Sequence, residues 1–238
     1  MSPADATLNF EKPMNTFITG TDTGVGKTFA TALLLRHLRR RGIDCVPFKP
    51  ICCGVRTDAE ILLAAAGDEA VAAGLTINEI NPLWLRTPAA PWTAAMIEGR
   101  PLDLALVRDT YAALRARHPG GVLVEGVGGW LVPITRELTV ADLAREMNLP
   151  VIVVVKNRLG ALNHTLLTVR HLQSIGLKCA GLIFNAGPTL NAATADAETE
   201  AGEAIACHTN RAVCEDLLGV PILAELTHAQ LDWPGENV

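Results

Sequence analysis

The stretch of the chain with the clearest chemical signature is a glycine-rich segment near its start, Gly20-Thr-Asp-Thr-Gly-Val-Gly-Lys-Thr28. Backbone N–H groups in such a turn converge on phosphate oxygens, and the positive end of the following helix adds a favourable potential. Lys27 can then reach the β- and γ-phosphates, and the Thr28 hydroxyl can ligate Mg²⁺. The spacing departs from the common form, because five residues rather than four separate Gly20 from Gly26. The intact Gly-Lys-Thr still predicts a phosphate-binding loop.

Three charged residues further along the chain fit the same chemistry. Lys49 follows an apolar strand-like run, where a lysine could neutralise a transferring phosphoryl group, although a lone lysine at a strand end is more often a solvated charge. Glu125 ends the run Gly121 to Glu125 and enters a glycine-rich turn, which suits an acid that binds Mg²⁺ beside the loop. Asp58 begins a predicted helix and fits either a metal ligand or an N-cap.

The elements that must position these residues alternate between short apolar runs and helical periodicity. The pattern predicts strands at 15–19, 45–48, 122–125, 150–155, 179–185 and 221–224, and helices at 27–41, 58–66, 102–117 and 163–175. Residues 188–207 have weak periodicity and predict loop and helix. Such alternation is typical of an α/β fold, a mostly parallel β-sheet with helices on both faces.

Composition narrows the class of protein. A net charge of −5 without a long basic run gives no electrostatic case for a nucleic acid or a membrane as partner. The six cysteines show no Cys-x-x-Cys spacing and predict reduced thiols in a cytoplasmic protein. Residues 1–13 are polar and irregular, which predicts a disordered extension, and residues 14–238 are expected to form one domain.

Five motifs in a fixed order carry a resemblance to a known family. After the glycine-rich loop come Phe-Lys-Pro at 48–50, Glu-Gly-Arg-Pro at 98–101, Val-Glu-Gly-Val-Gly-Gly-Trp at 124–130 and Leu-Gly-Ala-Leu-Asn-His at 159–164. Over about residues 15–226, the chain resembles the dethiobiotin synthetases, a family of P-loop enzymes. The resemblance implies that 7,8-diaminononanoate, CO₂ and ATP are converted with Mg²⁺ to dethiobiotin, ADP and phosphate, in biotin synthesis.

The resemblance also assigns roles to residues. It implies that Lys27 and Lys49 are catalytic and stabilise the transferring phosphoryl group. Nucleotide binding falls to Gly24, Val25, Gly26, Lys27, Thr28, Phe29, Asp58, Glu125, Gly126, Val127, Gly128, Asn185, Thr227, His228 and Ala229. Magnesium binding falls to Thr28, Asp58 and Glu125, and substrate binding to Thr23, Cys53, Gly160, Ala161, Leu162 and Asn163.

Two consequences of the resemblance concern the substrate side. The family is expected to form a homodimer in which the helix start at 160–163 meets the substrate's distal carboxylate across the interface, although Asn163 taken alone fits a plain N-cap. Cys53 stands where the family usually has a small hydroxyl residue, so this side of the site departs most from the family.

An alternative class shares the glycine-rich loop. P-loop switch ATPases of the partition and division-site type dimerise over ATP and bind partners or membranes. They usually carry an additional lysine early in the loop, where this chain has Thr21, Asp22 and Thr23. The loop sequence therefore favours the biosynthetic interpretation.

Overall fold

A parallel β-sheet forms the centre of the molecule, whose computed structural model describes residues 14–186, 197–227 and 230–234. Its six strands lie in the order β2-β5-β1-β6-β7-β8, and all neighbouring strands run parallel. In chain order these strands are β1 (Thr16–Gly20), β2 (Cys45–Phe48), β5 (Gly121–Glu125), β6 (Val151–Lys156), β7 (Cys179–Asn185) and β8 (Ile222–Leu226). Because parallel strands end at one edge, the residues that follow them gather there.

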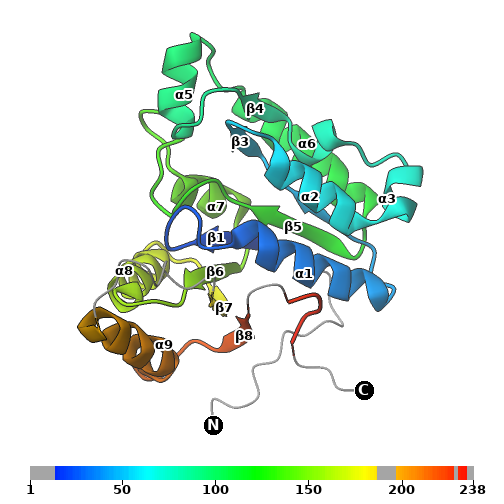
Figure 1. Ribbon diagram of the computed structural model, residues 1–238. Helices are drawn as coiled ribbons and strands as arrows, with labels where there is room; N and C mark the ends of the chain where they lie inside the picture. The colour runs from blue at the N-terminus through cyan, green and yellow to red at the C-terminus, as the bar shows by residue number, and fades with distance from the viewer. Residues whose placement is uncertain (1–13, 187–196, 228–229, 235–238) are drawn as a thin grey trace.

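Helices flank this sheet on both sides (Figure 1). Helix α1 (Lys27–Arg40) packs against β1, β2 and β5, and α8 (Ala161–Ser174) packs against β6 and β7. The others are α2 (Thr57–Ala66), α3 (Asp68–Ala72), α4 (Ile77–Ile80), α5 (Pro91–Glu98), α6 (Leu104–Arg117), α7 (Val140–Met147) and α9 (Ala197–Leu218). The predicted fold class, a mostly parallel sheet covered on both faces, is confirmed.

The core is aliphatic, as the composition requires. Strands β5 and β6 are buried along nearly their whole length, and Phe17, Phe48 and Phe184 are the largest fully buried side chains among the described residues. A strand buried on both faces shows a continuous apolar run rather than alternation, which is why these strands were readable from the sequence.

A second, two-stranded parallel sheet is the main feature that the sequence did not predict. Its strands are β3 (Ile51–Cys53) and β4 (Leu83–Leu85), paired from Ile51 with Leu83 to Cys53 with Leu85. Strands of three residues carry no periodic signal, and their pairing joins segments some thirty residues apart. In the small sheet, the chain that follows Lys49 runs away from the central sheet.

Other differences are local. Helices α3, α4, α5 and α7 were not predicted, although α7 carries a capping box between Thr139 and Asp142 that is visible in sequence. Helix α8 begins two residues earlier than expected, because Gly160, with φ 85°, is the N-cap. Helix α9 is far more regular than the expected loop and helix at 188–207; residues 187–196 lie outside the described part.

Part of the chain is not described by the structure. Residues 1–13, for which the sequence predicts a disordered extension, lie outside the described residues, and the single domain at 14–238 stays a prediction. None of the helices in the described part combines the length and apolar character needed to cross a bilayer.

A substitution at Gly121, the first residue of β5, tests how tightly the sheet is packed around the strand that carries Glu125. Gly121 has φ +113°, and a Cβ there would lie 2.6 Å from the backbone nitrogen of Met14. Gly74 also has a positive φ, +94°, but its Cβ would meet nothing within 4 Å. We expect Gly74→Ala to cost about 1–2 kcal/mol of unfolding free energy from backbone strain alone.

Gly121→Ala should cost about 2 kcal/mol more than Gly74→Ala, because backbone atoms cannot move aside as a flexible side chain can. Urea unfolding of the two variants measures the difference. Equal losses would show that the start of β1 can shift without penalty.

Candidate active site

The glycine-rich loop joins β1 to α1 and presents backbone N–H groups at the start of that helix. Gly26 is the N-cap of α1 with φ 93°, and the first helical turn contains no acidic residue. A Cβ at Gly26 would lie 2.0 Å from Nδ2 of Asn185, so the loop is closely packed from the β7 side. Free N–H groups in a first turn that contains no acidic residue make this helix start suited to an anion.

A buried cluster of opposite charges lies beside the loop. Lys49 Nζ donates to Glu125 Oε1 at 2.5 Å and to the Gly126 carbonyl at 3.1 Å, and it lies 3.1 Å from Asp58 Oδ2. The Thr28 hydroxyl donates to the same Glu125 oxygen at 2.8 Å. Lys49 is 2% exposed and Glu125 is fully buried, so the interpretation of Lys49 as a solvated surface charge is wrong.

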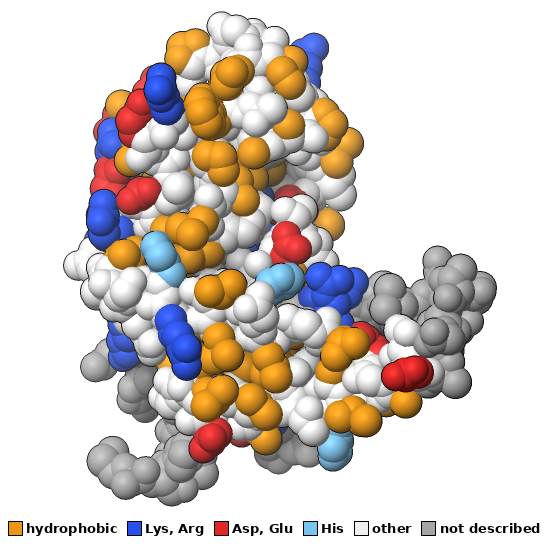
Figure 2. Space-filling model, turned by 90° about the vertical axis from the view of Figure 1, so that its left-hand side faces the viewer, with side chains coloured by type: hydrophobic (Ala, Val, Ile, Leu, Met, Phe, Trp, Pro, Cys, Tyr) orange, Lys and Arg blue, Asp and Glu red, His pale blue; other side chains and the backbone are white. Residues whose placement is uncertain are grey.

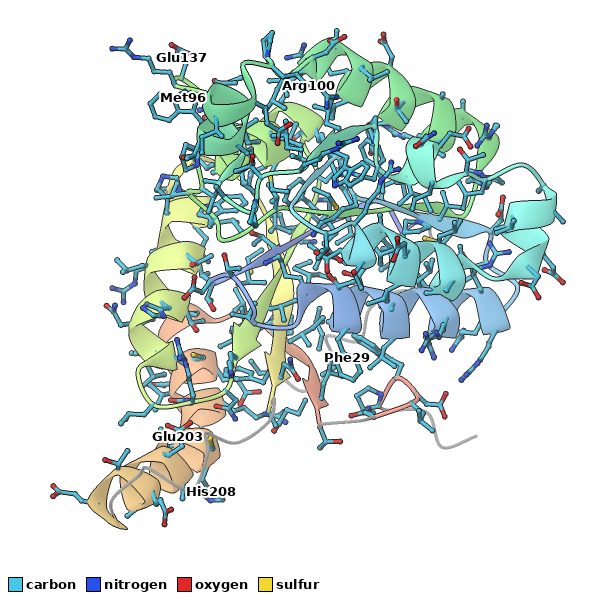
Figure 3. The ribbon with its side chains drawn as sticks, turned by 45° about the horizontal axis from the view of Figure 1, so that its top comes forward. Phe29, Met96, Arg100, Glu137, Glu203 and His208 are labelled. Carbon is cyan, nitrogen blue, oxygen red and sulfur yellow. The ribbon has the colours of Figure 1, made fainter. Side chains whose placement is uncertain are left out.

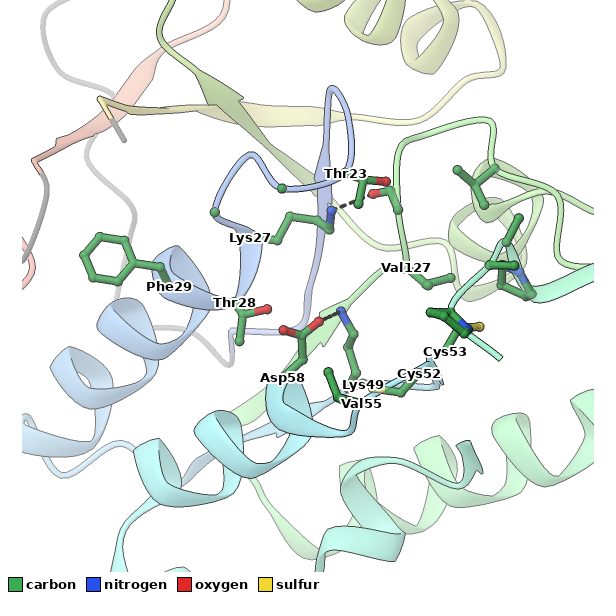
Figure 4. A pocket seen from close by; sticks show the side chains of 18 residues that line it. Thr23, Lys27, Thr28, Phe29, Lys49, Cys52, Cys53, Val55, Asp58 and Val127 are labelled. Atoms are coloured by element: carbon green, nitrogen blue, oxygen red, sulfur yellow. Dashed lines mark hydrogen bonds and ion pairs between the residues drawn. The ribbon is translucent and has the colours of Figure 1, made fainter. Parts of the chain in front are cut away.

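Asp58 is likewise not an N-cap. Helix α2 begins at Thr57 with Arg56 as its N-cap, which places Asp58 one residue into the helix. Its carboxylate is directed toward Lys49 across the cleft (Figure 4). The structure therefore brings together the four residues Thr28, Lys49, Asp58 and Glu125, which come from α1, the position after β2, α2 and the end of β5.

Lys27 is the second lysine of the site and has no carboxylate among the described residues as a direct partner. Its Nζ donates to the Gly128 carbonyl at 2.6 Å and to the Asp22 carbonyl at 3.3 Å. Burial, together with repulsion from Lys49, lowers the pKa of Lys27 from 10.5 to about 8. A lysine whose pKa is lowered in this way is partly neutral near pH 8, and it gains charge when a polyanion binds beside it.

The pKa values of the other two groups move in opposite directions. Burial by itself lowers the pKa of Lys49, but the carboxylates of Glu125 and Asp58 outweigh it and hold that pKa above its ordinary value. Burial raises the pKa of Asp58, but Lys49 more than offsets this effect, and the Asp58 pKa lies below its usual range. The ammonium and carboxylate forms of this pair stabilise each other.

The donor set fits a magnesium ion that is shared with phosphate. Glu125 Oε2 is buried and has no hydrogen-bond partner among the described residues, and Asp58 and Thr28 both line the cleft. No group of three or more His, Cys, Asp or Glu side chains in the described part could hold a metal by itself. Mg²⁺ is commonly held by one or two carboxylates plus phosphates and water, so this short set is sufficient when a nucleotide is present.

Thr28, Lys49 and Asp58 line a cavity of about 620 Å³ (Figure 4), whereas the fully buried Glu125 is not among its lining residues. One wall is the phosphate-binding loop with Thr23, Gly24, Gly26, Lys27 and Thr28, and the opposite wall comes from β3 and the segment before α5. Val127 and Gly128 close one end. The predicted residues Thr23, Lys27, Thr28, Lys49, Cys53 and Asp58 therefore meet in one cavity, as the sequence suggested.

Cys53 lines the opposite wall together with Cys52. Burial raises the pKa of Cys53 to about 11 and that of Cys52 to about 12, so both thiols are protonated at neutral pH. The Cys53-Gly54 turn is fixed by β4, because Trp84 Nε1 donates to the Gly54 carbonyl at 2.8 Å and Gly54 N donates to Leu85 O at 2.9 Å. Cys53 thus contributes shape rather than a nucleophile.

Three residues of the predicted nucleotide-binding set, Phe29, Asn185 and Thr227, lie toward β7 and β8, and Phe29 also lines the cavity. Asn185 at the end of β7 donates from Nδ2 to the Val25 carbonyl at 2.9 Å, and Thr227 follows the neighbouring strand β8. Phe29 points from α1 toward β8 (Figure 3), away from Lys49 and Cys53 (Figure 4). Two further residues of this prediction, His228 and Ala229, lie outside the described residues.

The helix start at 160–163 does not reach the cavity of its own chain. None of Gly160, Ala161, Leu162 and Asn163 lines it, and Asn163 is exposed. The interpretation of Asn163 as an N-cap is wrong, because Gly160 has that position and Asn163 is the third residue of α8. Within one chain, this helix start therefore does not contact the cavity.

Several residues of the cavity were not predicted. They are Cys52, Val55, Pro88, Ala89, Ala90, Pro91 and Val132. Most lie on irregular segments, and only Pro91, at the first position of α5, gives a local signal as a helix start. Their common role as a wall follows from the pairing of β3 with β4.

The fold and site together define a P-loop nucleotide-binding enzyme. The profile described as an AAA domain matches residues 14–233. A protein of Akkermansia muciniphila named ATP-dependent dethiobiotin synthetase is 41% identical over 216 residues, which cover 91% of this chain and 93% of that one. One of the same name from Anaeromyxobacter dehalogenans is 45% identical over 173 residues, covering 71% and 75%. The chain belongs to the dethiobiotin synthetase family.

The likeness to solved structures is more remote. A ParA family ATPase from Chlorobium tepidum matches with a TM-score of 0.50 and 10% sequence identity, over 91% of this chain and 85% of that one. Such a likeness shows the shared fold and says nothing about a common activity. The sequence relatives therefore favour the biosynthetic interpretation over the switch ATPase.

The lowered pKa of Lys27 predicts that ATP binding is linked to proton uptake. Above pH 8 the free enzyme holds Lys27 neutral, and bound phosphates raise its pKa again, so binding takes up a proton and affinity falls by up to about tenfold per pH unit. Titration calorimetry in two buffers of different ionisation enthalpy, at pH 7 and pH 9, measures the uptake.

Lys27→Arg is the control, because arginine stays charged throughout this range. In that variant the extra proton uptake at pH 9 should disappear. An unchanged uptake would assign the titration to a different group.

Proposed function

We propose that this chain catalyses the ATP-dependent closure of the ureido ring of dethiobiotin from 7,8-diaminononanoate and CO₂. The observation that carries the proposal is the convergence of Lys49, Glu125, Asp58 and Thr28 beside the phosphate-binding loop. Family membership supplies the substrates, and the cavity supplies a place where a transferred phosphoryl group would meet two lysines. The geometry is that of phosphoryl transfer by positioning and charge.

In this proposal the nucleotide lies across the phosphate-binding loop. Its triphosphate lies over the loop and the start of α1, and its base extends toward Asn185, Phe29 and Thr227. The diamine occupies the other side, against Cys53 and the wall formed by residues 88–91. The γ-phosphate would then lie between the two ligands and within reach of Lys27 and Lys49.

The reaction needs no covalent nucleophile from the protein. One amine of the substrate adds to CO₂ and gives a carbamate, whose oxygen attacks the γ-phosphorus while the bond to ADP breaks. The second amine then attacks the carbamate carbon, and inorganic phosphate leaves as the ring closes. Lys27 and Lys49 offset the charge that accumulates on the transferring phosphoryl group.

Magnesium would be held by Glu125, Asp58 and Thr28 together with phosphate oxygens. When bound, the ion would supply positive charge that offsets the charge of the phosphate groups. Glu125 is the central residue of this set, because its Oε1 holds Lys49 and Thr28 while its Oε2 has no protein partner in the described part.

The active form in this proposal is a cytoplasmic homodimer that needs no nucleic acid or membrane. Exposed hydrophobic side chains support a dimer: Leu159 and Leu167 are 56% and 64% exposed, and Leu131 and Ile205 are 54% and 65% exposed. Figure 2 views the side of the molecule that carries α5, α8 and α9, where hydrophobic side chains gather. A hollow of about 370 Å³ lies beside Leu131 and Leu167. A second copy that covers this face would bring its residues 160–163 toward the substrate.

The function is tested by phosphate release from ATP. We expect the rate to rise at least about tenfold when bicarbonate and 7,8-diaminononanoate are added together, and to stay low with either one alone. Lys27→Ala should remove the stimulated rate while the chain stays folded. An ATPase rate that ignores this pair of substrates would support the switch ATPase.

Shared sites predict complementation between two inactive variants. Lys27→Ala removes the phosphate contact, and Asn163→Asp places a negative charge at the helix start that is proposed to meet the substrate carboxylate. Each mixed dimer holds one intact site, so an equal mixture should recover about a quarter of the wild-type activity.

The two variants carry different affinity tags, so that mixed dimers can be isolated and their formation confirmed before the assay. The matched control mixes Lys27→Ala with Lys49→Ala, whose defects lie in the same half of the site. Every site in that mixture carries one of the two lysine substitutions, so the mixture should stay inactive. Inactive mixed dimers in the first experiment would place each site within a single chain.

A further inference from the structure

The main chain of Lys49 is held from outside the central sheet. Its N–H donates to the Ile80 carbonyl at 2.7 Å, and its own carbonyl accepts from Asn81 Nδ2 at 2.8 Å. Pro50 follows and has no N–H to donate, and its carbonyl accepts from Leu83 N at 3.2 Å. The position of Lys49 therefore depends on a segment about thirty residues further along the chain.

Asn81 is the residue that ties this segment together. It is completely buried, and its carboxamide donates to the carbonyls of Lys49 and Leu83, at 2.8 and 3.0 Å, while its Oδ1 accepts from Arg56 Nε at 2.8 Å. Both donors and the acceptor of the amide are thus used. A buried amide with every group satisfied specifies one arrangement, since any shift leaves a polar group without a partner.

Arg56 extends the same network to the second charge of the site. Its Nη2 donates to the Asn81 carbonyl at 2.5 Å and to the Ile77 carbonyl at 3.3 Å, and its guanidinium lies 5.4 Å from the ring centre of Trp84. Arg56 is also the N-cap of α2, the helix on which Asp58 faces Lys49. Through Asn81 and Arg56, the positions of Lys49 and of its carboxylate partner are set by the same contacts.

We infer that Asn81 is a positioning residue for phosphoryl transfer, which fixes Lys49 and, through Arg56, Asp58. The inference rests on the catalytic role proposed for Lys49. Asn81 does not line the cavity and touches neither substrate, so its effect must pass through these two residues. Its loss should reduce the stabilisation of the transition state more than the binding of either substrate.

The test compares Asn81→Ala with the isosteric Asn81→Asp. The aspartate keeps an acceptor for Arg56 but has no donor for the carbonyls of Lys49 and Leu83, and it should fold even if the alanine variant does not. We expect both to lower kcat by about tenfold, with the KM for ATP and for the diamine changed less than about threefold. Wild-type kcat in Asn81→Asp would overturn the inference.

A double variant separates positioning from general destabilisation. If Asn81 acts through Lys49, adding Asn81→Asp to Lys49→Ala should lower kcat by less than about twofold, because the shared interaction is already gone. A full tenfold further loss would show that Asn81 acts independently and would overturn the inference. Leu114→Ala, a buried position on α6, is the control that lowers the thermal stability with kcat per folded molecule unchanged.

The same measurements distinguish a failure of the inference from a failure of the proposed function. Lack of dependence on bicarbonate and diamine in the wild type would remove the function. Wild-type kcat in Lys49→Ala would remove the role of Lys49, and the inference with it, while ring closure stays supported by the substrate dependence.

Discussion

The ion pair between Lys49 and Glu125 is the interaction on which the rest of the site depends. Both groups are almost completely buried, with 2.5 Å between Lys49 Nζ and Glu125 Oε1. A buried charge is tolerable only when an opposite charge and further hydrogen bonds replace its lost water. Asp58, Thr28 and the Gly126 carbonyl supply those contacts, so the two sheets and α2 must meet around this pair.

The central sheet and the small sheet position different parts of the site. β1 and β5 bring the phosphate-binding loop and Glu125 to the same sheet edge, because parallel neighbours end together. The β3–β4 sheet then forms the opposite wall and holds Cys53 there. The phosphate-binding loop is thus carried by the central parallel sheet, whereas the wall opposite the loop is built on two short strands.

The two lysines of the site are electrostatically unequal. Carboxylates surround Lys49 and keep its pKa above the ordinary value, so it stays charged whether or not a nucleotide is present. In the described part of the chain, the hydrogen bonds of Lys27 Nζ go to carbonyl groups, and burial with repulsion from Lys49 lowers its pKa to about 8. A fixed charge that is already paired needs little reorganisation, whereas Lys27 loses its charge above pH 8 unless a polyanion binds beside it.

The sequence alone determined the glycine-rich loop, the strands of the central sheet and the family, because contiguous apolar runs and motif spacing are local signals. It also identified Lys49, Asp58 and Glu125 as chemically useful residues. Only the tertiary structure decided that they form one buried cluster, that residues 160–163 lie outside the cavity of their own chain, and that Asn81 holds Lys49. These facts depend on pairing between distant segments, which leaves no periodic pattern in the residues concerned.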